Sequence, residues 1–239
     1  MNKFSYDIVI PVLNEEKRLS TGIETISSFL ASNDFINCRI VIADNGSSDG
    51  TAMVANELCV EYPNVAYLSV GQRGVGLAIK AAWGQSSADV VGYMDVDLAT
   101  DLEHFKEVVA IFEGGGVHVV NGSRNLPGSR VSNRKMLREI TSRGFNTLLR
   151  QILNTNITDG MCGFKFIRRD AYENIAECGI RNDGWFFCTE LLYLAEGLGF
   201  TVTEIPVRWY DDQDSRARIV QLSTNYLQEI IRLRFRKFR

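Results

Sequence analysis

Long hydrophobic runs are missing from this 239-residue chain. No stretch approaches the roughly 18 uninterrupted apolar residues that a membrane-spanning helix needs. The apolar run 8–13 is too short for a signal peptide, and no small-residue cleavage site follows it. We therefore expect a cytoplasmic protein that does not span a membrane.

Cysteine and histidine are also scarce. The five cysteines are an odd number, and none of them form a C-x-x-C pair. This argues against a disulfide framework or a zinc site and fits a reducing compartment. We assign no role to the two histidines, His104 and His118.

A strong net charge is absent too, because the formal value is −3. This gives no general attraction to phosphate backbones, and we expect no nucleic-acid partner. Basic residues nevertheless gather in segments 124–150 and 232–239, which suggests two surfaces that face anions. They are Arg124, Arg130, Arg134, Lys135, Arg138, Arg143 and Arg150 in the first segment, and Arg232, Arg234, Arg236, Lys237 and Arg239 in the second.

The chain does contain an alternation of short apolar runs and amphipathic segments of helix length. Strands are expected at 6–11, 39–43, 65–70, 90–94, 117–121, 163–167 and 201–207. Helices are expected at about 17–31, 74–84, 102–112, 133–153 and 190–197, with another after the turn 44–51, where Ser48 or Asp49 would be the N-cap. This order predicts an α/β fold with a doubly wound, mostly parallel sheet flanked by helices. We expect one domain over 1–216 and a basic amphipathic helix within 217–239.

Acidic and amide side chains follow the predicted strands. Asn14 and Glu15 follow the first strand, Asp44 ends the second, and Asp95 and Asp97 follow the fourth. The carboxyl ends of parallel strands meet at one edge of a sheet, where ligands of such folds bind. These side chains should therefore face one crevice.

Asp95 and Asp97 form a D-x-D motif. On an extended segment, side chains two residues apart point the same way. Two carboxylates so placed can hold Mg²⁺ or Mn²⁺, which take their remaining ligands from water and phosphate oxygens. A polar strand end or a helix cap is the alternative interpretation.

The glycine-rich segment 71–76 does not match a dinucleotide-binding fingerprint. Its spacing differs from G-x-G-x-x-G, it follows the third strand, and no suitably placed acid comes about 20 residues later. It is either an anion-binding loop at a helix N-terminus or a tight turn.

Seven motifs in order carry a family resemblance: PVLNEE from Pro11, DNGSSDGT from Asp44, RGVG from Arg73, YMDVDL from Tyr93, GSR from Gly122, TDGMCGFK from Thr158 and DGWFFCTELL from Asp183. Together they resemble the family 2 glycosyltransferases of GT-A fold. Within that family the chain is most similar to dolichyl-phosphate and polyprenyl-phosphate glycosyltransferases.

The resemblance implies a role for particular residues. Around a nucleotide sugar it places Pro11, Asn14, Glu15, Asp44, Asn45, Arg73, Gly74 and Asp95. It implies that Asp44 accepts a hydrogen bond from a pyrimidine N–H, which favours a UDP-sugar donor. Asp95 and Asp97 would bind the metal, and Arg124 would clamp a phosphate. Asp159 or Glu190 would orient the acceptor or accept a proton, and the anomeric centre would be inverted.

Among the departures from the pattern of the family, those at Cys188 and Ala99 bear on the chemistry, whereas those at Val75 and Asn45 matter less. Relatives usually carry an acid at the position of Cys188, and Ala99 cannot supply the third metal ligand that some relatives have. A hydroxyl acceptor needs a general base, whereas a lipid monophosphate is already anionic near neutral pH. We therefore expect a polyprenyl phosphate acceptor. A saccharide hydroxyl acceptor in cell-envelope assembly and a catalytically impaired nucleotide-sugar-binding homologue are the alternatives.

The C-terminal segment 219–239 has apolar residues at helical spacing, namely Ile219, Leu222, Tyr226, Ile230 and Leu233. This helix either lies in an anionic membrane interface or packs on the domain with solvated arginines. The basic helix at 133–153 follows Arg124 closely, which favours peripheral membrane association.

Overall fold

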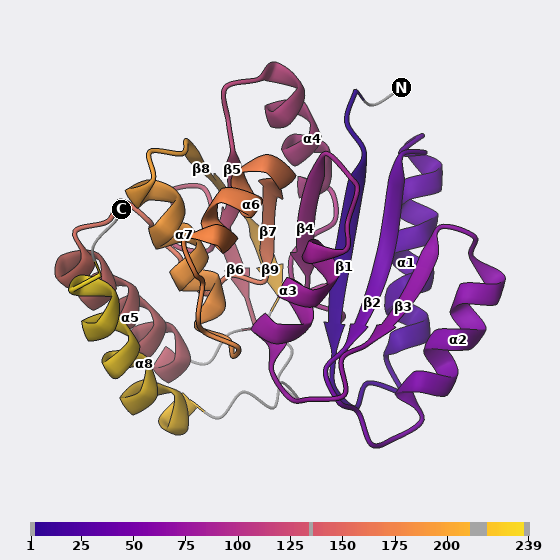
Figure 1. The fold of residues 1–239 in the computed structure, drawn as a ribbon, viewed down its shortest axis with the longest axis horizontal. Coiled ribbons are helices and arrows are strands. Elements are labelled where there is room, and N and C mark those ends of the chain that lie inside the picture. Colours follow the sequence, from indigo (N-terminus) through magenta and orange to yellow (C-terminus); the bar gives the residue numbers. More distant parts are fainter. Residues whose placement is uncertain (1–2, 134–135, 211–218, 237–239) are drawn as a thin grey trace.

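The computed structural model of the chain describes residues 3–133, 136–210 and 219–236 (Figure 1). In chain order the elements are β1 (Tyr6–Val12), α1 (Leu19–Ser32), β2 (Cys38–Asp44), α2 (Thr51–Glu61), β3 (Val65–Ser69), α3 (Val75–Gly84), β4 (Val90–Met94), α4 (His104–Gly114), β5 (Val119–Ser123), β6 (Arg130–Ser132), α5 (Met136–Leu153), β7 (Phe164–Arg168), α6 (Arg169–Glu177), α7 (Phe187–Gly197), β8 (Val202–Pro206), β9 (Arg208–Tyr210) and α8 (Ile219–Arg234).

A seven-stranded sheet of order β3-β2-β1-β4-β7-β5-β8 forms the centre of the fold. Neighbouring strands pair in parallel, except that β7 runs antiparallel to both β4 and β5. The chain winds from β1 outward to β3 and then returns to β4 on the other side of β1. The predicted doubly wound, mostly parallel sheet is confirmed, and its switch point lies between β1 and β4.

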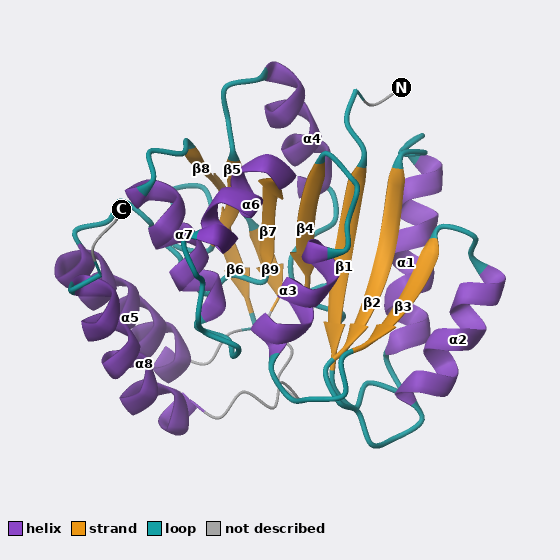
Figure 2. Cartoon of the chain, in the orientation of Figure 1, coloured by secondary structure: helices purple, strands orange, loops and turns teal. Residues whose placement is uncertain are grey.

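Helices cover both faces of this sheet (Figure 2). Strand β1 shows why, because Ile8 and Ile10 face one hydrophobic cluster while Val9 between them faces the other. The first cluster lies under α1, α2 and α4, and the second under α3, α6 and α7. A strand that is buried on both faces has a continuous run of apolar residues, and such runs allowed these strands to be predicted from the sequence.

Several local expectations need correction. The short pair β6–β9 and helix α6 were not predicted. Helix α2 has Gly50 at its N-cap position rather than Ser48 or Asp49. The Asp49 carboxylate still accepts the backbone N–H of Thr51 at 3.0 Å, so it caps the helix from one position further out.

The C-terminal helix packs against the domain. Tyr226, Ile230 and Leu233 of α8 are buried in the second cluster, and the Tyr226 ring lies 5.7 Å from the Phe145 ring of α5. Among the described helices, none combines the length and the apolar character needed to cross a bilayer.

Some predicted features fall outside the described residues. They are the boundary after residue 216, the basic residues Arg134, Lys135, Lys237 and Arg239, and the side chains of Arg138, Ile219 and Leu222.

Candidate functional site

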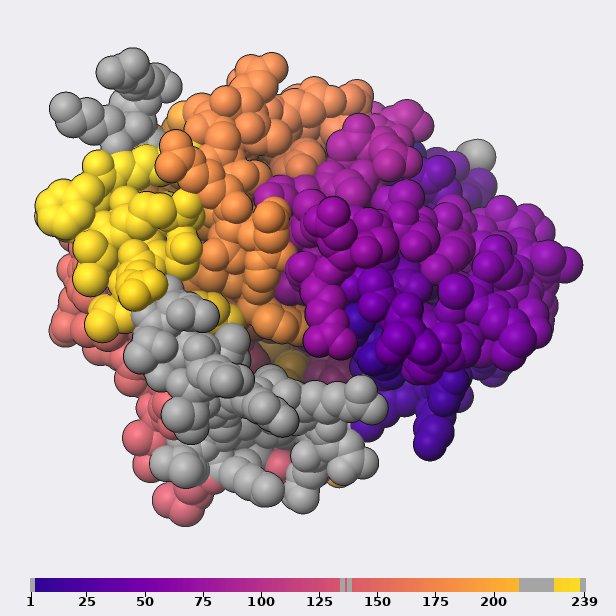
Figure 3. Space-filling model, turned by 60° about the horizontal axis from the view of Figure 1, so that its bottom comes forward, coloured from indigo at the N-terminus to yellow at the C-terminus, as the bar shows by residue number. Residues whose placement is uncertain are grey.

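The carboxyl ends of β1, β2, β4 and β5 meet at one edge of the sheet, as the sequence predicts. Val12 pairs with Asp44 across β1 and β2, and Met94 at the end of β4 pairs with Phe164. Figure 3 looks onto this edge, where the surface is hollowed between the purple N-terminal half and the orange segment of the C-terminal half. The predicted residues that follow β1, β2, β4 and β5 therefore lie along this one edge.

The loops after β1 and β2 hold each other in place. Asn14 has a φ of 57°, a left-handed conformation that asparagine tolerates. Its Oδ1 accepts the backbone N–H of Ser48 at 2.8 Å, and its own N–H donates to Ser47 Oγ at 2.9 Å. The backbone N–H of Glu15 donates to Thr51 Oγ1 at 2.9 Å. These bonds fix the position of Asn14 and Glu15 at the entrance of the crevice.

Asp44 is nearly buried, and each of its carboxylate oxygens has one donor. Oδ1 accepts the backbone N–H of Ser47 at 2.8 Å, and Oδ2 accepts the Tyr67 hydroxyl at 2.9 Å. A carboxylate oxygen can accept a second hydrogen bond. Asp44 is thus held in one orientation with acceptor capacity left.

The glycine-rich loop reaches the same region. The backbone N–H of Gly74 donates to Asn45 Oδ1 at 3.5 Å, which joins the loop before α3 to the end of β2. Gly74 has a φ of 155°, where a side chain is strained. Arg73 beside it is exposed, and Pro11 in β1 is half-buried. The structure thus brings Asn45, Gly74 and Arg73 to the edge where Asp44 lies.

Asp95 and Asp97 lie on a turn, so the expectation of an extended segment was wrong. The N–H of Leu98 donates to the Asp95 carbonyl at 3.1 Å, and Leu98 has a φ of 51°. Asp97 accepts the N–H of Ala99 at 3.1 Å. A turn reverses the chain within four residues, and this one keeps both carboxylates at the end of β4.

The surroundings of Asp95 disfavour its ionised form and leave little space around its carboxylate. Burial raises the pKa of its carboxyl to about 7, the Asp97 charge adds to the rise, and Arg124 and Lys165 oppose it. Gly163 borders the carboxylate so closely that a Cβ there would lie 1.8 Å from Asp95 Oδ2. Only glycine at 163 leaves room for this side chain.

The two aspartates fit a divalent cation by their chemistry. The Asp97 charge raises the pKa of Asp95, and a cation bound beside both carboxylates would offset this repulsion. Both are oxygen donors, which suit Mg²⁺ or Mn²⁺ better than zinc. No group of three or more His, Cys, Asp and Glu residues forms a metal site within the described part of the chain, so other ligands would come from water or a bound diphosphate.

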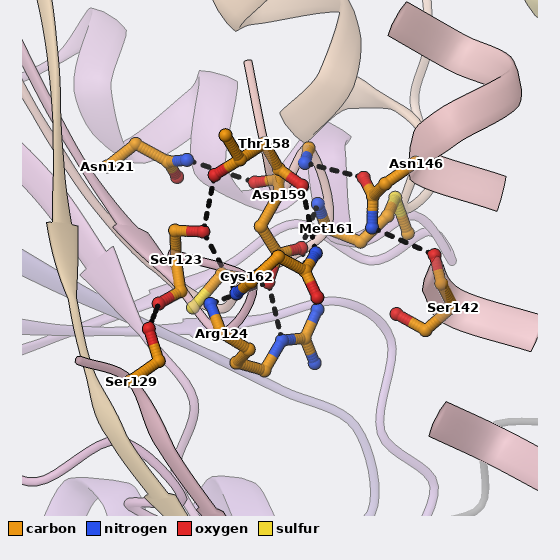
Figure 4. Close-up of polar contacts among 12 residues, drawn as sticks. Asn121, Ser123, Arg124, Ser129, Ser142, Asn146, Thr158, Asp159, Met161 and Cys162 are labelled. Atoms are coloured by element: carbon orange, nitrogen blue, oxygen red, sulfur yellow. Dashed lines mark hydrogen bonds and ion pairs between the residues drawn. The ribbon is translucent and has the colours of Figure 1, made fainter. Parts of the chain in front are cut away.

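Arg124 and Asp159 form a buried ion pair at the end of β5 (Figure 4). Arg124 Nε and Nη2 donate to the two carboxylate oxygens at 2.7 and 2.9 Å, and its backbone N–H adds a third bond at 3.1 Å. Burial alone would raise the pKa of Asp159, but Arg124 lowers it below the usual range. The guanidinium also lies 5.2 Å from the Trp209 ring. Asp159 therefore orients Arg124.

Cys188 is buried at the start of α7. Its Sγ lies 2.7 Å from the hydroxyl of Tyr93, and burial raises the pKa of the thiol. A neutral buried thiol does not act as a general base near neutral pH. Position 188, where the family resemblance implies an acid, is therefore part of the core in this chain.

Lys165 is a site residue to which the sequence analysis gave no role. It is fully buried, its Nζ donates to the carbonyl of Cys162, and its charge opposes the rise in the pKa of Asp95. A buried lysine in a β-strand gives no pattern in the sequence that separates it from a solvated one.

Glu190 belongs to a network with the C-terminal segment. Its carboxylate is fully buried and accepts hydrogen bonds from Arg232 of α8, from Arg236 just after α8 and from the backbone of the loop before α7. The structure thus brings together most of the predicted residues and places Glu190 in a separate network.

A hollow adjoins the turn that carries Asp97. Its walls come from the turn itself and from β6 and β9. The lining residues are Leu98, Ala99, Asp101, Arg130, Ser132, Arg208, Trp209 and Tyr210. Arginines and aromatic rings next to the turn of Asp95 and Asp97 suit an anionic ligand with an apolar or sugar portion.

Comparisons with known proteins support one family. The sequence profile described as "Glycosyl transferase family 2" matches residues 7–176. The glycosyltransferase AglD of Haloferax volcanii is 33% identical over 219 residues, which are 90% of this chain but only 34% of AglD. The dolichyl-phosphate beta-glucosyltransferase of Dictyostelium discoideum is 30% identical, over 96% of this chain and 73% of that enzyme.

A polyprenol monophosphomannose synthase from Mycolicibacterium smegmatis is 28% identical over 84% of the chain and 75% of its own length. Among solved structures, glucosyl-3-phosphoglycerate synthase of Mycobacterium tuberculosis, in complex with Mn²⁺, UDP and glucosyl-3-phosphoglycerate, superposes with a TM-score of 0.69. The match covers 97% of this chain and 80% of that one at 18% identity. It shows a shared GT-A fold.

Proposed function

The chain belongs to glycosyltransferase family 2, and from that premise we propose that it transfers a hexose from a UDP-sugar to a polyprenyl phosphate. The observation that carries the proposal is the meeting of Asn14, Asp44, Asp95 and Asp97 with Arg124 at the sheet's switch point. Relatives named for dolichyl-phosphate glucosyl transfer and polyprenol mannosyl transfer support this acceptor class.

The donor nucleotide would lie over the carboxyl ends of β1 and β2. Asp44, fixed by Ser47 and Tyr67, would accept a hydrogen bond from the uracil N–H. Asn14, Glu15, Asn45 and the loop at Gly74 would line the same pocket. Solved relatives bind UDP together with Mn²⁺, which supports this class of donor.

The diphosphate would lie next to Asp95 and Asp97, which would hold Mg²⁺ or Mn²⁺. The cation would offset the charge that develops on the leaving UDP. Arg124, which Asp159 keeps in a fixed orientation, would place one of its remaining guanidinium N–H donors toward a phosphate oxygen. These residues account for the departure of the nucleotide.

The acceptor phosphate would attack the anomeric carbon on the side opposite the diphosphate. A bond forms from the phosphate oxygen to this carbon while the carbon–oxygen bond to UDP breaks, and the configuration is inverted. No proton has to be removed, because a phosphate monoester is already ionised near neutral pH. The absence of a base at the buried Cys188 therefore favours this acceptor over a saccharide hydroxyl.

A lipid acceptor requires access to a membrane surface, which we propose lies on the cytoplasmic face. Helices α5 and α8 lie side by side (Figure 1). Large apolar side chains on these helices and just after α8 are exposed, namely Met136, Ile140, Leu148, Leu227, Ile231 and Phe235. The exposed Arg143, Arg150 and Arg234 on the same helices suit anionic lipid headgroups.

The proposal is tested by transfer of label from UDP-glucose into the organic phase. Purified protein is incubated with undecaprenyl phosphate in detergent and Mg²⁺ or Mn²⁺, with a chelator as control. We expect metal-dependent labelling that Asp97→Asn lowers at least 100-fold. Asp34→Asn, which changes an exposed aspartate at the end of α1, should leave the labelling unchanged.

The other outcomes are informative. Metal-dependent UDP binding without lipid labelling would overturn the lipid acceptor or the choice of glucose, and a saccharide acceptor would be tried next. Absence of UDP binding by the wild-type protein would overturn the donor assignment itself.

A further inference from the structure

Glu190 joins two segments that lie far from each other in the sequence. It is fully buried in the first turn of α7. Oε2 accepts the backbone N–H groups of Arg181 and Asn182 at 3.1 and 2.7 Å. Oε1 accepts Arg232 Nη2 at 2.9 Å and Arg236 Nη1 at 3.1 Å. One carboxylate therefore holds the loop before α7 on one side and the C-terminal helix region on the other.

The C-terminal side of this link is strong. Arg236 also donates to the carbonyls of Cys178 and Gly179, so it contacts the start of the loop as well as Glu190. Hydrogen bonds between ionised partners are stronger than neutral ones, especially in a buried setting. Separation of α8 from the domain would leave the Glu190 charge buried without its two guanidinium partners.

The loop side of the link leads to the donor pocket. The N–H of Leu77 in α3 donates to the carbonyl of Asp183 at 3.1 Å, and Lys80 forms an ion pair with the Asp183 carboxylate at 2.6 Å. A Cβ at Gly74 would lie 2.6 Å from the same carbonyl. Gly74 and the first turn of α3 thus pack directly against the loop 181–184.

Gly74 in turn donates to Asn45, next to Asp44. A continuous set of contacts therefore runs from α8 through Glu190 and the loop 181–184 to the residues that would hold the nucleotide. Two sites are energetically coupled when both influence the arrangement of one structural element between them. Here that element is the loop 181–184.

We propose that Glu190 is a positioning residue through which the docked C-terminal helix sets the affinity of the donor pocket. The inference rests on the proposed function for the identity of the donor. It makes α8 more than a packing element, since the arrangement of Gly74 and Asn45 depends on its attachment. By reciprocity, a bound donor nucleotide strengthens the docking of α8.

The test uses the full chain with two substitutions made separately. Glu190→Gln keeps the shape and can still accept a backbone N–H, but it removes the charge that attracts both arginines. Arg236→Met removes the guanidinium that contacts Cys178 and Gly179, while Arg232 still pairs with Glu190. Arg168→Met is the matched control, because it removes an arginine that pairs with the exposed Asp170 away from this link.

Two measurements are made at a temperature where each variant is fully folded. The first is the dissociation constant of UDP with Mn²⁺ by calorimetry, and the second is amide hydrogen exchange at Leu77, Arg181 and Asn182. We expect both link variants to bind UDP at least 10-fold more weakly and to exchange these amides faster, whereas Arg168→Met matches the wild type.

A purely structural role of Glu190 would lower the melting temperature but leave the UDP affinity of the folded protein unchanged. UDP affinity within twofold of the wild type in both link variants, with unchanged exchange at the three amides, would overturn the inference. If the wild-type protein itself does not bind UDP, the proposed function fails. In that case the exchange measurement alone tests whether Glu190 connects α8 to the loop 181–184. Unchanged exchange rates at Leu77, Arg181 and Asn182 in both variants would disprove this connection.

Discussion

At the scale of single residues, the acidic site depends on a missing side chain. Gly163 leaves the space that the Asp95 carboxylate occupies, and no rotamer of Asp95 could keep its place beside a Cβ only 1.8 Å away. Close approach of a side chain to backbone is a typical reason for glycine at a functional site.

Gly163→Ala should therefore displace Asp95 and weaken metal-dependent UDP binding at least 10-fold. The dissociation constant by calorimetry, with and without Mn²⁺, measures the effect. Gly114→Ala is the control, since a Cβ at Gly114 would have nothing within 4 Å. Equal UDP affinity of Gly163→Ala and the wild type would show that the position of Asp95 does not matter for the donor.

Asp95 also links the site to stability. Its pKa is about 7 in the folded protein and about 3.9 in an unfolded chain. The folded state thus binds a proton more readily, and the contribution of Asp95 to stability falls as pH rises from about 4 to about 7. Above that range its ionised form destabilises the metal-free protein.

Asp95→Asn should stabilise the metal-free protein at pH 8, by up to about 4 kcal/mol for a shift of about three pKa units. The gain should be a small fraction of this near pH 4, where the carboxyl is protonated in the folded state and about half protonated in an unfolded chain. Denaturant unfolding with a chelator at both pH values measures this. A gain that is the same at pH 4 and pH 8 would refute the electrostatic explanation.

Cys188→Asp tests whether the wild-type chain lacks a base. If the acceptor is a phosphate, turnover with undecaprenyl phosphate should stay the same or fall, because no proton has to be removed. A carboxylate in the buried place of Cys188 should also lower the melting temperature. A rise in turnover from near zero would instead identify the wild-type chain as an impaired homologue.

At the scale of elements, the strands that are buried on both faces were predicted from the sequence, and β4 was placed at its observed bounds. The three-residue strands β6 and β9 carry too few residues to show a period. The turn at Asp95–Leu98 was also missed, since a run such as DVDL continues the apolar pattern of β4. The sequence alone predicted that the acids lie at one edge, but it did not predict buried polar neighbours such as Lys165 beside Asp95 or Tyr93 beside Cys188, because buried polar contacts come from tertiary packing.

The loop between α5 and β7 is fastened to the end of β5 by Arg124 and Asp159. Asp159→Asn leaves a buried guanidinium without its charged partner, and we expect a loss of about 3–5 kcal/mol in unfolding free energy. Asp170→Asn removes an exposed partner of Arg168 and should cost less than about 1 kcal/mol. Urea unfolding compares the two, and equal losses would contradict the role given to burial.

At the scale of the whole molecule, the sequence left the C-terminal helix with two interpretations. The structure shows that α8 packs on the domain by one face, while Leu227 and Ile231 of the helix and Phe235 just after it remain exposed. Arg232 and Arg236 form ion pairs with the buried Glu190. A basic, amphipathic sequence pattern does not predict this, because it does not distinguish arginines that pair with a buried acid from arginines in solvent. The membrane interpretation stays a prediction for the outer face.

Charge reversal of the exposed Arg143, Arg150 and Arg234 should reduce flotation with anionic liposomes by at least half, since each basic residue near such a surface contributes about 1 kcal/mol. A second variant with reversals at Lys3, Lys106 and Arg168 carries the same change in net charge away from α5 and α8. Flotation of both variants at the wild-type level would contradict a membrane-facing role of these helices.

The single antiparallel strand has a consequence for how the protein is made. Strand β7 lies between β4 and β5, so the two parts of the sheet cannot join until β7 has been synthesised. The first four strands can assemble early from local pairings, whereas the later strands wait for contacts between residues distant in the chain. On the ribosome, the nascent chain would therefore expose an unpaired β4 edge from the emergence of β4 until β7 emerges, and the two parts of the sheet that carry the site could not be joined before then.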